Sequence, residues 1–215
     1  MPEFNLLNTH PKIKRDIKSR KKFKNKEVIK ISRKFEKHYF DGSRKYGYGG
    51  YYYDGRWIAV AKNIKQNYNL KKGSKVLDIG CAKGFLVKDL LSLGIDAYGI
   101  DISKYAIKNC EKEVIGRLHQ GSADKLPFPD NSFDFVISIN AIHNFNKRGV
   151  LKSLKEISRV SKKNSFIQVD SYRNKNERKI FLDWVLTAYY HDYPKNWIKL
   201  FKEAGYKGDY YWTIV

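Results

Sequence analysis

The sequence predicts an α/β protein with a doubly wound, mostly parallel sheet of six or seven strands and helices on both faces. Between residues 75 and 170, short apolar runs alternate with amphipathic segments, which is typical of βαβ units. At residues 75–93 one such run leads into a glycine-containing turn and then a helical pattern, as in nucleotide-binding folds. A chain of 215 residues has enough volume for one domain with a sizeable core.

Apolar periodicity places the individual elements. Helices are predicted, in chain order, at residues 26–40, 57–68, 85–93, 103–115, 147–160, 176–190 and 197–204. Strands are predicted at residues 75–79, 95–100, 117–120, 133–139, 165–170 and 210–215. Because strands and helices alternate through the core, the crossovers between parallel strands should be right-handed.

Composition divides the chain into three parts. Residues 1–45 form a basic N-terminal arm, expected to be partly disordered or helical, because the run at 11–26 has little apolar surface to bury. Residues 46–72 combine a tyrosine- and glycine-rich stretch with the first helix before the core. Residues 73–215 hold the core and an aromatic C-terminal part.

The formal net charge of +21 has two interpretations. A polyanionic partner, such as nucleic acid, an acidic membrane surface or an anionic substrate, would explain it. Compositional drift also explains it, because lysine outnumbers arginine, whereas sites that recognise phosphate favour the arginine fork. We favour drift and solubility and keep a charged partner as the alternative.

Several classes of protein are disfavoured by the sequence. Every apolar run is shorter than the ~18 residues that span a bilayer, so we expect no transmembrane segment, and no secretory pattern is seen at the N-terminus. The two cysteines, Cys81 and Cys110, fit a reducing compartment better than a disulfide framework. We expect a cytoplasmic protein without a metal site.

The turn at residues 78–84 has the features of a nucleotide-type binding site. Gly80 and Gly84 can adopt backbone angles closed to other residues, and they leave room for a ligand against the main chain. Asp101 ends the next strand, where a carboxylate can accept hydrogen bonds from two ribose hydroxyls. A capping role for Asp101 is the alternative, although Ser103 already provides a helix cap.

These segments resemble the class I S-adenosylmethionine-dependent methyltransferases of the small-molecule type, a family that includes quinone-biosynthesis methyltransferases. The resemblance lies in residues 76–84, 99–101, 121–128 and 133–138, in the family's order and spacing. Ala82 stands where a glycine is commoner. The resemblance implies a Rossmann-like fold, S-adenosyl-L-methionine as methyl donor and S-adenosyl-L-homocysteine as product. The family normally has an antiparallel strand pair at the C-terminal end, whereas this sequence has room for one full strand.

The resemblance also implies a set of residues around the methyl donor, which should converge on one adenosine. Asp124 would accept a hydrogen bond from the adenine amino group, and the Ala123 amide would donate one to a ring nitrogen. The alternative for Asp124 is a carboxylate in a surface turn. The cofactor-binding residues predicted in this way are Asp78, Gly80, Cys81, Ala82, Gly84, Asp101, Ile102, Ala123, Asp124 and Asn140.

Two residues after the fourth predicted core strand are candidates for catalysis, because the end of this strand faces the transferable methyl in the family. Asn140 could orient the acceptor. His143, with a pKa near neutrality, could take a proton from an attacking hydroxyl or amine. Packing beneath the cofactor is an equally open role for His143. The Asx-Pro-Pro-aromatic signature of amino-DNA methyltransferases is absent here, which argues against that kind of base methylation.

Aromatic residues on both sides of the core are candidates for a lid and a substrate pocket. In the stretch at 46–57, one of Tyr48, Tyr51 and Tyr52 could cover the site, because aromatic faces attract a sulfonium cation. Near the C-terminus, Trp184 and Tyr189 could line a pocket for a planar or cationic substrate. Core packing is the alternative for both groups.

The acceptor expected from these observations is a small molecule, anionic or aromatic in character. A methyltransferase acting on RNA or protein through the basic arm is the alternative, although a nucleic-acid partner is not favoured. A cofactor-binding partner subunit without activity of its own is the third interpretation. The sequence does not indicate which atom is methylated or the oligomeric state.

Overall fold

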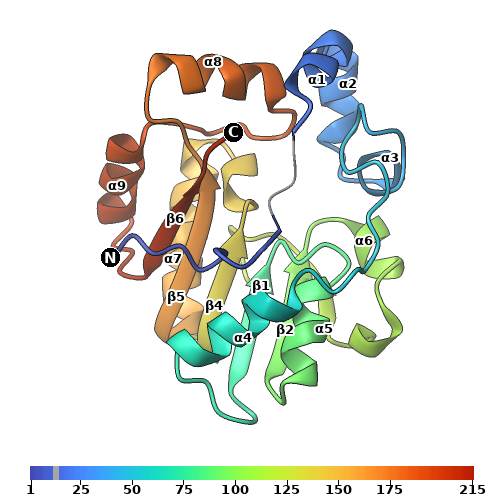
Figure 1. Ribbon diagram of the computed structural model, residues 1–215. Helices are drawn as coiled ribbons and strands as arrows, with labels where there is room; N and C mark the ends of the chain where they lie inside the picture. Colours follow the sequence, from blue (N-terminus) through green and yellow to red (C-terminus); the bar gives the residue numbers. More distant parts are fainter. Residues whose placement is uncertain (12–14) are drawn as a thin grey trace.

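Six parallel strands form the sheet of this protein, whose computed structural model describes residues 1–11 and 15–215. The spatial order is β3-β2-β1-β4-β5-β6, and every neighbouring pair runs parallel. This confirms the predicted doubly wound architecture (Figure 1). The strands are β1 (Lys75–Ile79), β2 (Asp96–Asp101), β3 (Leu118–Gln120), β4 (Phe133–Ile139), β5 (Ser161–Asp170) and β6 (Asp209–Thr213).

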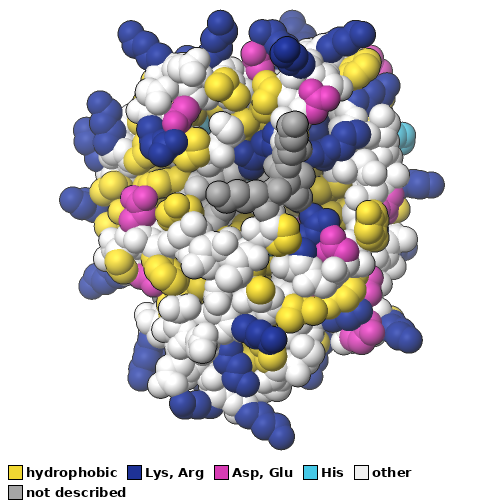
Figure 2. Space-filling view, in the orientation of Figure 1, with side chains coloured by type: hydrophobic (Ala, Val, Ile, Leu, Met, Phe, Trp, Pro, Cys, Tyr) yellow, Lys and Arg dark blue, Asp and Glu magenta, His cyan; other side chains and the backbone are white. Residues whose placement is uncertain are grey.

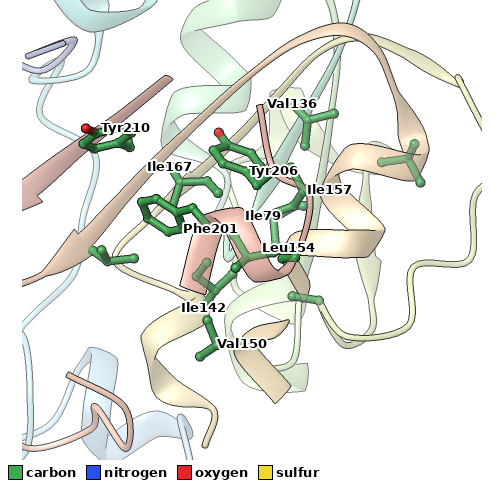
Figure 3. Close-up of a cluster of buried hydrophobic side chains, with 14 of the residues drawn as sticks. Ile79, Val136, Ile142, Val150, Leu154, Ile157, Ile167, Phe201, Tyr206 and Tyr210 are labelled. Atoms are coloured by element: carbon green, nitrogen blue, oxygen red, sulfur yellow. The ribbon is translucent and has the colours of Figure 1, made fainter. Parts of the chain in front are cut away.

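Helices pack on both faces of the sheet because the central strands alternate two sets of apolar side chains. In β4, Val136 packs with α7 (Lys147–Val160) and α9 (Pro194–Glu203), and Figure 3 shows this cluster. Phe135 and Ile137 instead pack with α4 (Ile58–Asn67) and α5 (Phe85–Ser92). Burial on both faces is what a parallel sheet requires.

Three helices of the core differ from their predicted bounds: two are shorter, and α9, predicted over 197–204, begins three residues earlier. In place of one helix over 103–115, α6 (Lys104–Lys108) is followed by the 3₁₀ turn η1 (Lys112–Val114). Helix α8 (Lys175–Trp184) ends six residues before the predicted end, because Val185 turns extended and the chain enters a buried loop. Pro194 begins α9, a position where its fixed φ angle fits and its missing N–H is not needed. A second 3₁₀ turn, η2 (Ile142–Asn144), follows β4.

The N-terminal arm is helical in its described part, and residues 12–14 of its basic run lie outside the described residues. It holds α1 (Ile17–Phe23), α2 (Lys26–Ser32) and α3 (Lys37–Phe40). The single helix predicted over 26–40 was wrong, because Phe35 has a φ of 52° and interrupts it. Side chains of Asp16 and Asn25 cap α1 and α2.

The first residues of the chain lie along β6 at the edge of the sheet. The Phe4 N–H donates to the Tyr210 carbonyl at 2.9 Å, and the Tyr210 N–H donates to the Pro2 carbonyl at 3.2 Å. Leu6 is fully buried in the core on the same side as α4. One strand therefore forms at the C-terminal end, as predicted, and the N-terminal residues cover the edge that it would expose.

The end of the sheet where the strands have their carboxyl ends is the expected place for a functional site. The strands are parallel, so their carboxyl ends meet at the same edge, where open α/β sheets bind ligands. In Figure 1, α8 and the N-terminal helices lie across this end of the sheet. Among the described residues, every helix is too short or too polar to span a membrane.

Candidate functional site

The turn after β1 depends on backbone angles that favour glycine. Gly80 and Gly84 have φ angles of 80° and 77°, and Ala82 has a φ of 51°. A Cβ on Gly80 would lie 2.2 Å from the Ala141 Cβ, and a Cβ on Gly84 would lie 2.9 Å from a methyl of Leu118. The turn after β1 therefore touches the residue that follows the end of β4, and a side chain at position 80 would separate them.

Asp101 holds this turn in place. One carboxylate oxygen accepts from the Ala82 N–H at 2.8 Å, and the other accepts from the Ser103 N–H at 2.8 Å. Ser103 itself caps α6, accepting from the Ala106 N–H at 3.0 Å. Each carboxylate oxygen of Asp101 keeps a second lone pair, which is what the predicted contact with ribose hydroxyls needs.

Asp78 is a buried carboxylate to which no described residue donates a hydrogen bond. Its side chain lies at the end of β1 and is 6% exposed. Burial, together with the neighbouring charge of Asp101, raises the pKa of Asp78 to about 7. A buried carboxylate costs free energy unless a donor or a cation meets it. Asp78 is therefore suited to a ligand that brings a positive charge or hydrogen-bond donors.

Asp124 lines an open cavity of about 500 Å³ on the other side of the strand ends. The cavity lining also includes Asn144 and Tyr189, but neither Asp78 nor Asp101. Asp78 and Asp101 therefore lie together at the turn, whereas Asp124 lines a cavity whose lining does not include them. Ala123, which precedes Asp124, is buried. Ile102, which follows Asp101, is 56% exposed.

Aromatic side chains cover the turn, as expected for a lid. The ring of Tyr51 stacks on Phe85 with centroids 4.6 Å apart, and Tyr48 lies 4.3 Å from Tyr51. Burial raises the pKa of the Tyr51 phenol, with the charge of Asp78 adding to the effect. Tyr52 is 72% exposed and has no ring partner among the described aromatic residues. Of the three lid candidates, Tyr51 packs on the turn, Tyr48 packs on Tyr51 and is 43% exposed, and Tyr52 does neither.

Asn140 follows β4 in a strained backbone conformation, with a φ of 53°. Its Oδ1 accepts from the Thr213 hydroxyl at 2.8 Å, and that hydroxyl accepts from the Gln168 amide at 2.9 Å. Its side chain is exposed at the carboxyl edge of the sheet. Asparagine tolerates left-handed angles better than most residues, and such outliers often occur at functional sites. The Asn140 side chain is thus fixed in orientation and accessible.

His143 is held by the end of the neighbouring strand. It is 3% exposed, and its Nδ1 accepts from the Asp170 N–H at 3.0 Å. Its Nε2 lies 3.5 Å from a carboxylate oxygen of Asp170. Burial lowers the pKa of His143, which favours the neutral ring with the proton on Nε2. Because the Nδ1 lone pair is already used, the geometry favours positioning over proton abstraction.

The C-terminal candidates contact arginines of the N-terminal helices. Three guanidinium groups, those of Arg15, Arg20 and Arg44, surround the Trp184 ring. The Arg33 guanidinium lies 3.6 Å from the centroid of the Tyr189 ring. Trp184 and Tyr189 are therefore occupied on one face, and they do not form an aromatic cage of their own.

Sequence reasoning missed Asp170 and the arginines that face it. Asp170 ends β5 just as Asp101 ends β2, so a carboxylate at the carboxyl end of a predicted strand was an available signal. Arg15 donates to the Ile214 carbonyl, next to the Thr213 that pairs with Asp170, so this arginine lies near the same strand end. The position of the arginines depends on how α1 docks on α8, for which the sequence held no signal.

The core of the chain is similar to known methyltransferases. Residues 77–169 match the family model described as a methyltransferase domain. The chain is 34% identical over 145 residues to a sterol 24-C-methyltransferase of Gibberella zeae, covering 58% of this chain and 37% of the relative. It is 33% identical over 119 residues to a demethylmenaquinone methyltransferase of Anoxybacillus flavithermus, covering 50% and 48%. The chain thus spans about half or less of the length of these curated relatives.

Solved structures show the same fold. The crystal structure of the YcgJ protein from Bacillus subtilis superimposes with a TM-score of 0.56. The match covers 67% of this chain and 66% of that protein, at 22% sequence identity. At this identity the likeness concerns the fold alone.

Proposed function

We propose that residues 77–169, which match the methyltransferase domain model, form a class I S-adenosylmethionine-dependent methyltransferase domain, and that the chain transfers a methyl group to a small-molecule acceptor. S-adenosyl-L-methionine is the methyl donor of this family, and S-adenosyl-L-homocysteine is the product. The observation that carries the proposal is the pair Asp78 and Asp101, which flank the glycine turn at the carboxyl ends of β1 and β2.

The residues around the turn fit the methyl donor chemically. Asp78 offers a buried carboxylate without a protein donor, which suits the ammonium group of the donor's amino-acid part. Asp101 has acceptor capacity left for ribose hydroxyls. Gly80 and Gly84 keep the main chain bare where the ligand would approach, and Cys81 and Ala82 form the turn between them.

The adenine end of the donor is proposed to lie toward Asp124. The carboxylate of Asp124 and the amide of Ala123 provide one acceptor and one donor beside the open cavity. The exposed side chain of Ile102 offers an apolar surface for the flat face of a base. For one ligand to reach both Asp78 and Asp124, the aromatic cover over the turn would have to shift.

Two kinds of observation support a small acceptor. The relatives reported above are named for reactions on quinone and sterol molecules. On the face shown in Figure 2, Lys and Arg side chains spread around the whole outline instead of forming one continuous patch. A spread of this kind fits general solubility better than a groove for nucleic acid.

The chain's own contribution to the reaction is proposed to be mainly orientation. Asn140 has a fixed side chain at the end of β4, where it can direct a polar group of the acceptor. Tyr51, whose ring stacks on Phe85, is proposed to shield the turn from water, with Tyr48 packed on it. His143 is proposed to hold the ends of β4 and β5 together and not to take the proton itself.

Calorimetry with S-adenosyl-L-homocysteine tests the proposal. The unmodified chain should bind it, and Asp78→Asn and Asp101→Asn should each weaken binding at least roughly tenfold, since each removes a charge-assisted contact. Asp130→Asn, on a carboxylate whose side chain is 70% exposed, is the matched control and should bind as the unmodified chain does. Equal affinity in all four proteins would count decisively against the assignment.

A further inference from the structure

Three guanidinium groups from the N-terminal arm converge on one indole ring. The guanidinium carbon of Arg20 lies 4.6 Å from the centroid of Trp184, and those of Arg15 and Arg44 each lie 5.7 Å from it. Arginine stacks readily on tryptophan, so each contact is favourable by itself. Three like charges around one ring nevertheless repel one another unless an anion joins them.

These three arginines lack the carboxylate partners that other arginines of the chain have. Arg117 pairs with Asp96, and Arg173 pairs with Glu177. In the described part of the chain, residues 1–11 and 15–215, no salt bridge links the three arginines around Trp184 to a carboxylate. Arg20 is 7% exposed, and burial with the nearby charge of Arg44 lowers its pKa to about 10.

Main-chain carbonyls hold the three side chains in fixed positions. Arg20 donates to the Lys45 and Gly47 carbonyls at 3.3 and 3.2 Å. Arg44 donates to the Tyr48 carbonyl at 3.2 Å, and Arg15 donates to the Ile214 carbonyl at 2.9 Å. An arginine has five donors, so each fork keeps N–H groups for another acceptor. The side chains are therefore already ordered without a ligand, so that binding would cost little further side-chain entropy.

The cluster lies beside the candidate site. The carbonyls that Arg20 and Arg44 bind belong to the stretch that includes the lid tyrosines. Arg15 donates to the Ile214 carbonyl, next to Thr213, which pairs with Asp170 at the end of β5, and the Asp170 N–H donates to His143. Trp184 is the last residue of α8, which lies across the carboxyl end of the sheet in Figure 1. An anion bound here would stand between the lid and the strand ends.

We propose that Arg15, Arg20 and Arg44, arranged around Trp184, bind an anionic group, a carboxylate or a phosphate, of the small acceptor. The proposal rests on the proposed methyl transfer and adds the chemical class of its substrate. Arginine forks match both groups through paired N–H donors. The bound group would anchor the acceptor away from the reacting atom, so binding energy there would serve orientation.

Binding of inorganic phosphate and of succinate, measured at constant ionic strength with chloride as reference, tests the cluster without requiring the true acceptor. Calorimetry gives the affinity, and tryptophan fluorescence reports the surroundings of Trp184. We expect saturable binding of at least one of the two anions. Arg44→Gln and Arg15→Gln should each weaken it at least roughly tenfold, the loss of a charged hydrogen bond. Arg117→Gln, whose charge Asp96 already compensates at the amino end of β2, is the matched control and should change nothing.

The outcomes separate this proposal from the methyl-transfer proposal. The Arg15→Gln protein should bind S-adenosyl-L-homocysteine as tightly as the unmodified chain, because Arg15 contacts the Ile214 carbonyl and the Trp184 ring and does not hold the lid. Equal anion affinity in the arginine variants and the control, or no saturable binding of either anion, overturns the anion site whatever the donor does. Tight, steeply salt-dependent binding of a short RNA oligonucleotide with no binding of phosphate or succinate also overturns it. If the unmodified chain does not bind S-adenosyl-L-homocysteine, the methyl-transfer proposal is contradicted, whereas the anion site itself is still tested by phosphate and succinate.

Discussion

Lys83, inside the glycine turn, forms an ion pair with Asp41 at the end of α3. Its ammonium nitrogen lies 2.7 and 2.9 Å from the two carboxylate oxygens of Asp41, and it also donates to the Tyr51 carbonyl at 2.8 Å. The Tyr105 hydroxyl donates to the same carboxylate at 2.7 Å. One lysine therefore fastens the aromatic lid to the turn beneath it, from a position only 9% exposed.

Breaking this ion pair should loosen the lid more than the fold. We expect Asp41→Asn to reduce the free energy of unfolding by about 1 kcal/mol, as for a partly exposed pair. Amide hydrogen exchange should become faster at residues 39–51, while β1 and β4 keep their protection. Lys88→Gln, which breaks another partly exposed ion pair, with Glu111, is the control. Unchanged exchange in the lid of the Asp41→Asn protein would show that the ion pair does not hold it.

Two glycines with the same backbone angle allow the stability cost of backbone strain to be measured apart from that of steric crowding. Gly80 and Gly73 both have a φ of 80°, but a Cβ at 80 would strike Ala141, whereas a Cβ at 73 meets nothing within 4 Å. Gly73→Ala should cost about 1 kcal/mol from backbone strain alone. Gly80→Ala should cost several kcal/mol because the turn and the end of β4 must move apart as well. Urea denaturation compares them, and equal losses would contradict the steric argument.

The positions of the core elements could be predicted well because their signals are local. The bounds of β1, β4 and α7 agree with those read from apolar periodicity. The errors lie where tertiary contacts decide. Phe35 breaks a helix by adopting a left-handed conformation, and Val185 leaves α8 early to enter a buried loop. Neither event has a sequence signal as strong as a proline or a glycine.

The positions of candidate residues were predictable at strand ends, while their role in binding the donor stays a prediction. Asp78 and Asp101 follow from that rule, and Asp170 would have followed from it too. The contact between Lys83 and Asp41 joins positions 42 residues apart through a loop, and no pattern in the chain encodes such a distance. The arginines around Trp184 belong to the arm that the sequence predicts to be partly disordered or helical, because a charged run reveals its docking partner only in three dimensions.

The raised pKa of Asp78 predicts how the stability of the ligand-free protein depends on pH. In the unfolded chain this carboxyl ionises near pH 3.8, whereas in the folded protein its pKa is about 7. Its contribution to stability is thus fully present below pH 3.8 and is lost as the pH rises to 7. Asp78→Asn should therefore be more stable than the unmodified protein at pH 8, by on the order of a few kcal/mol.

The difference between the two proteins should shrink to a small remainder at pH 4, because Asp78 is protonated in the folded protein and only about half ionised in the unfolded chain. Thermal unfolding at pH 4, 6 and 8 provides the comparison, with Asp130→Asn as a control that should show no such trend. A constant difference between Asp78→Asn and the unmodified chain at all three pH values would mean that Asp78 is already ionised in the fold.

Replacing His143 by asparagine distinguishes a positioning residue from a general base. The asparagine Oδ1 can accept the hydrogen bond that Nδ1 receives from the Asp170 N–H, but it cannot take up a proton. If His143 only positions the strand ends, as its buried neutral ring suggests, methyl transfer should fall by less than about tenfold. Loss of a general base would cost roughly 10²–10⁴-fold.

The pKa of His143 is lowered by burial, so the unmodified protein should lose stability as the pH falls below 6.5, where the unfolded state takes up the proton. The asparagine variant should lack this loss. If the variant is folded but loses activity roughly 10²-fold or more, His143 has the catalytic role.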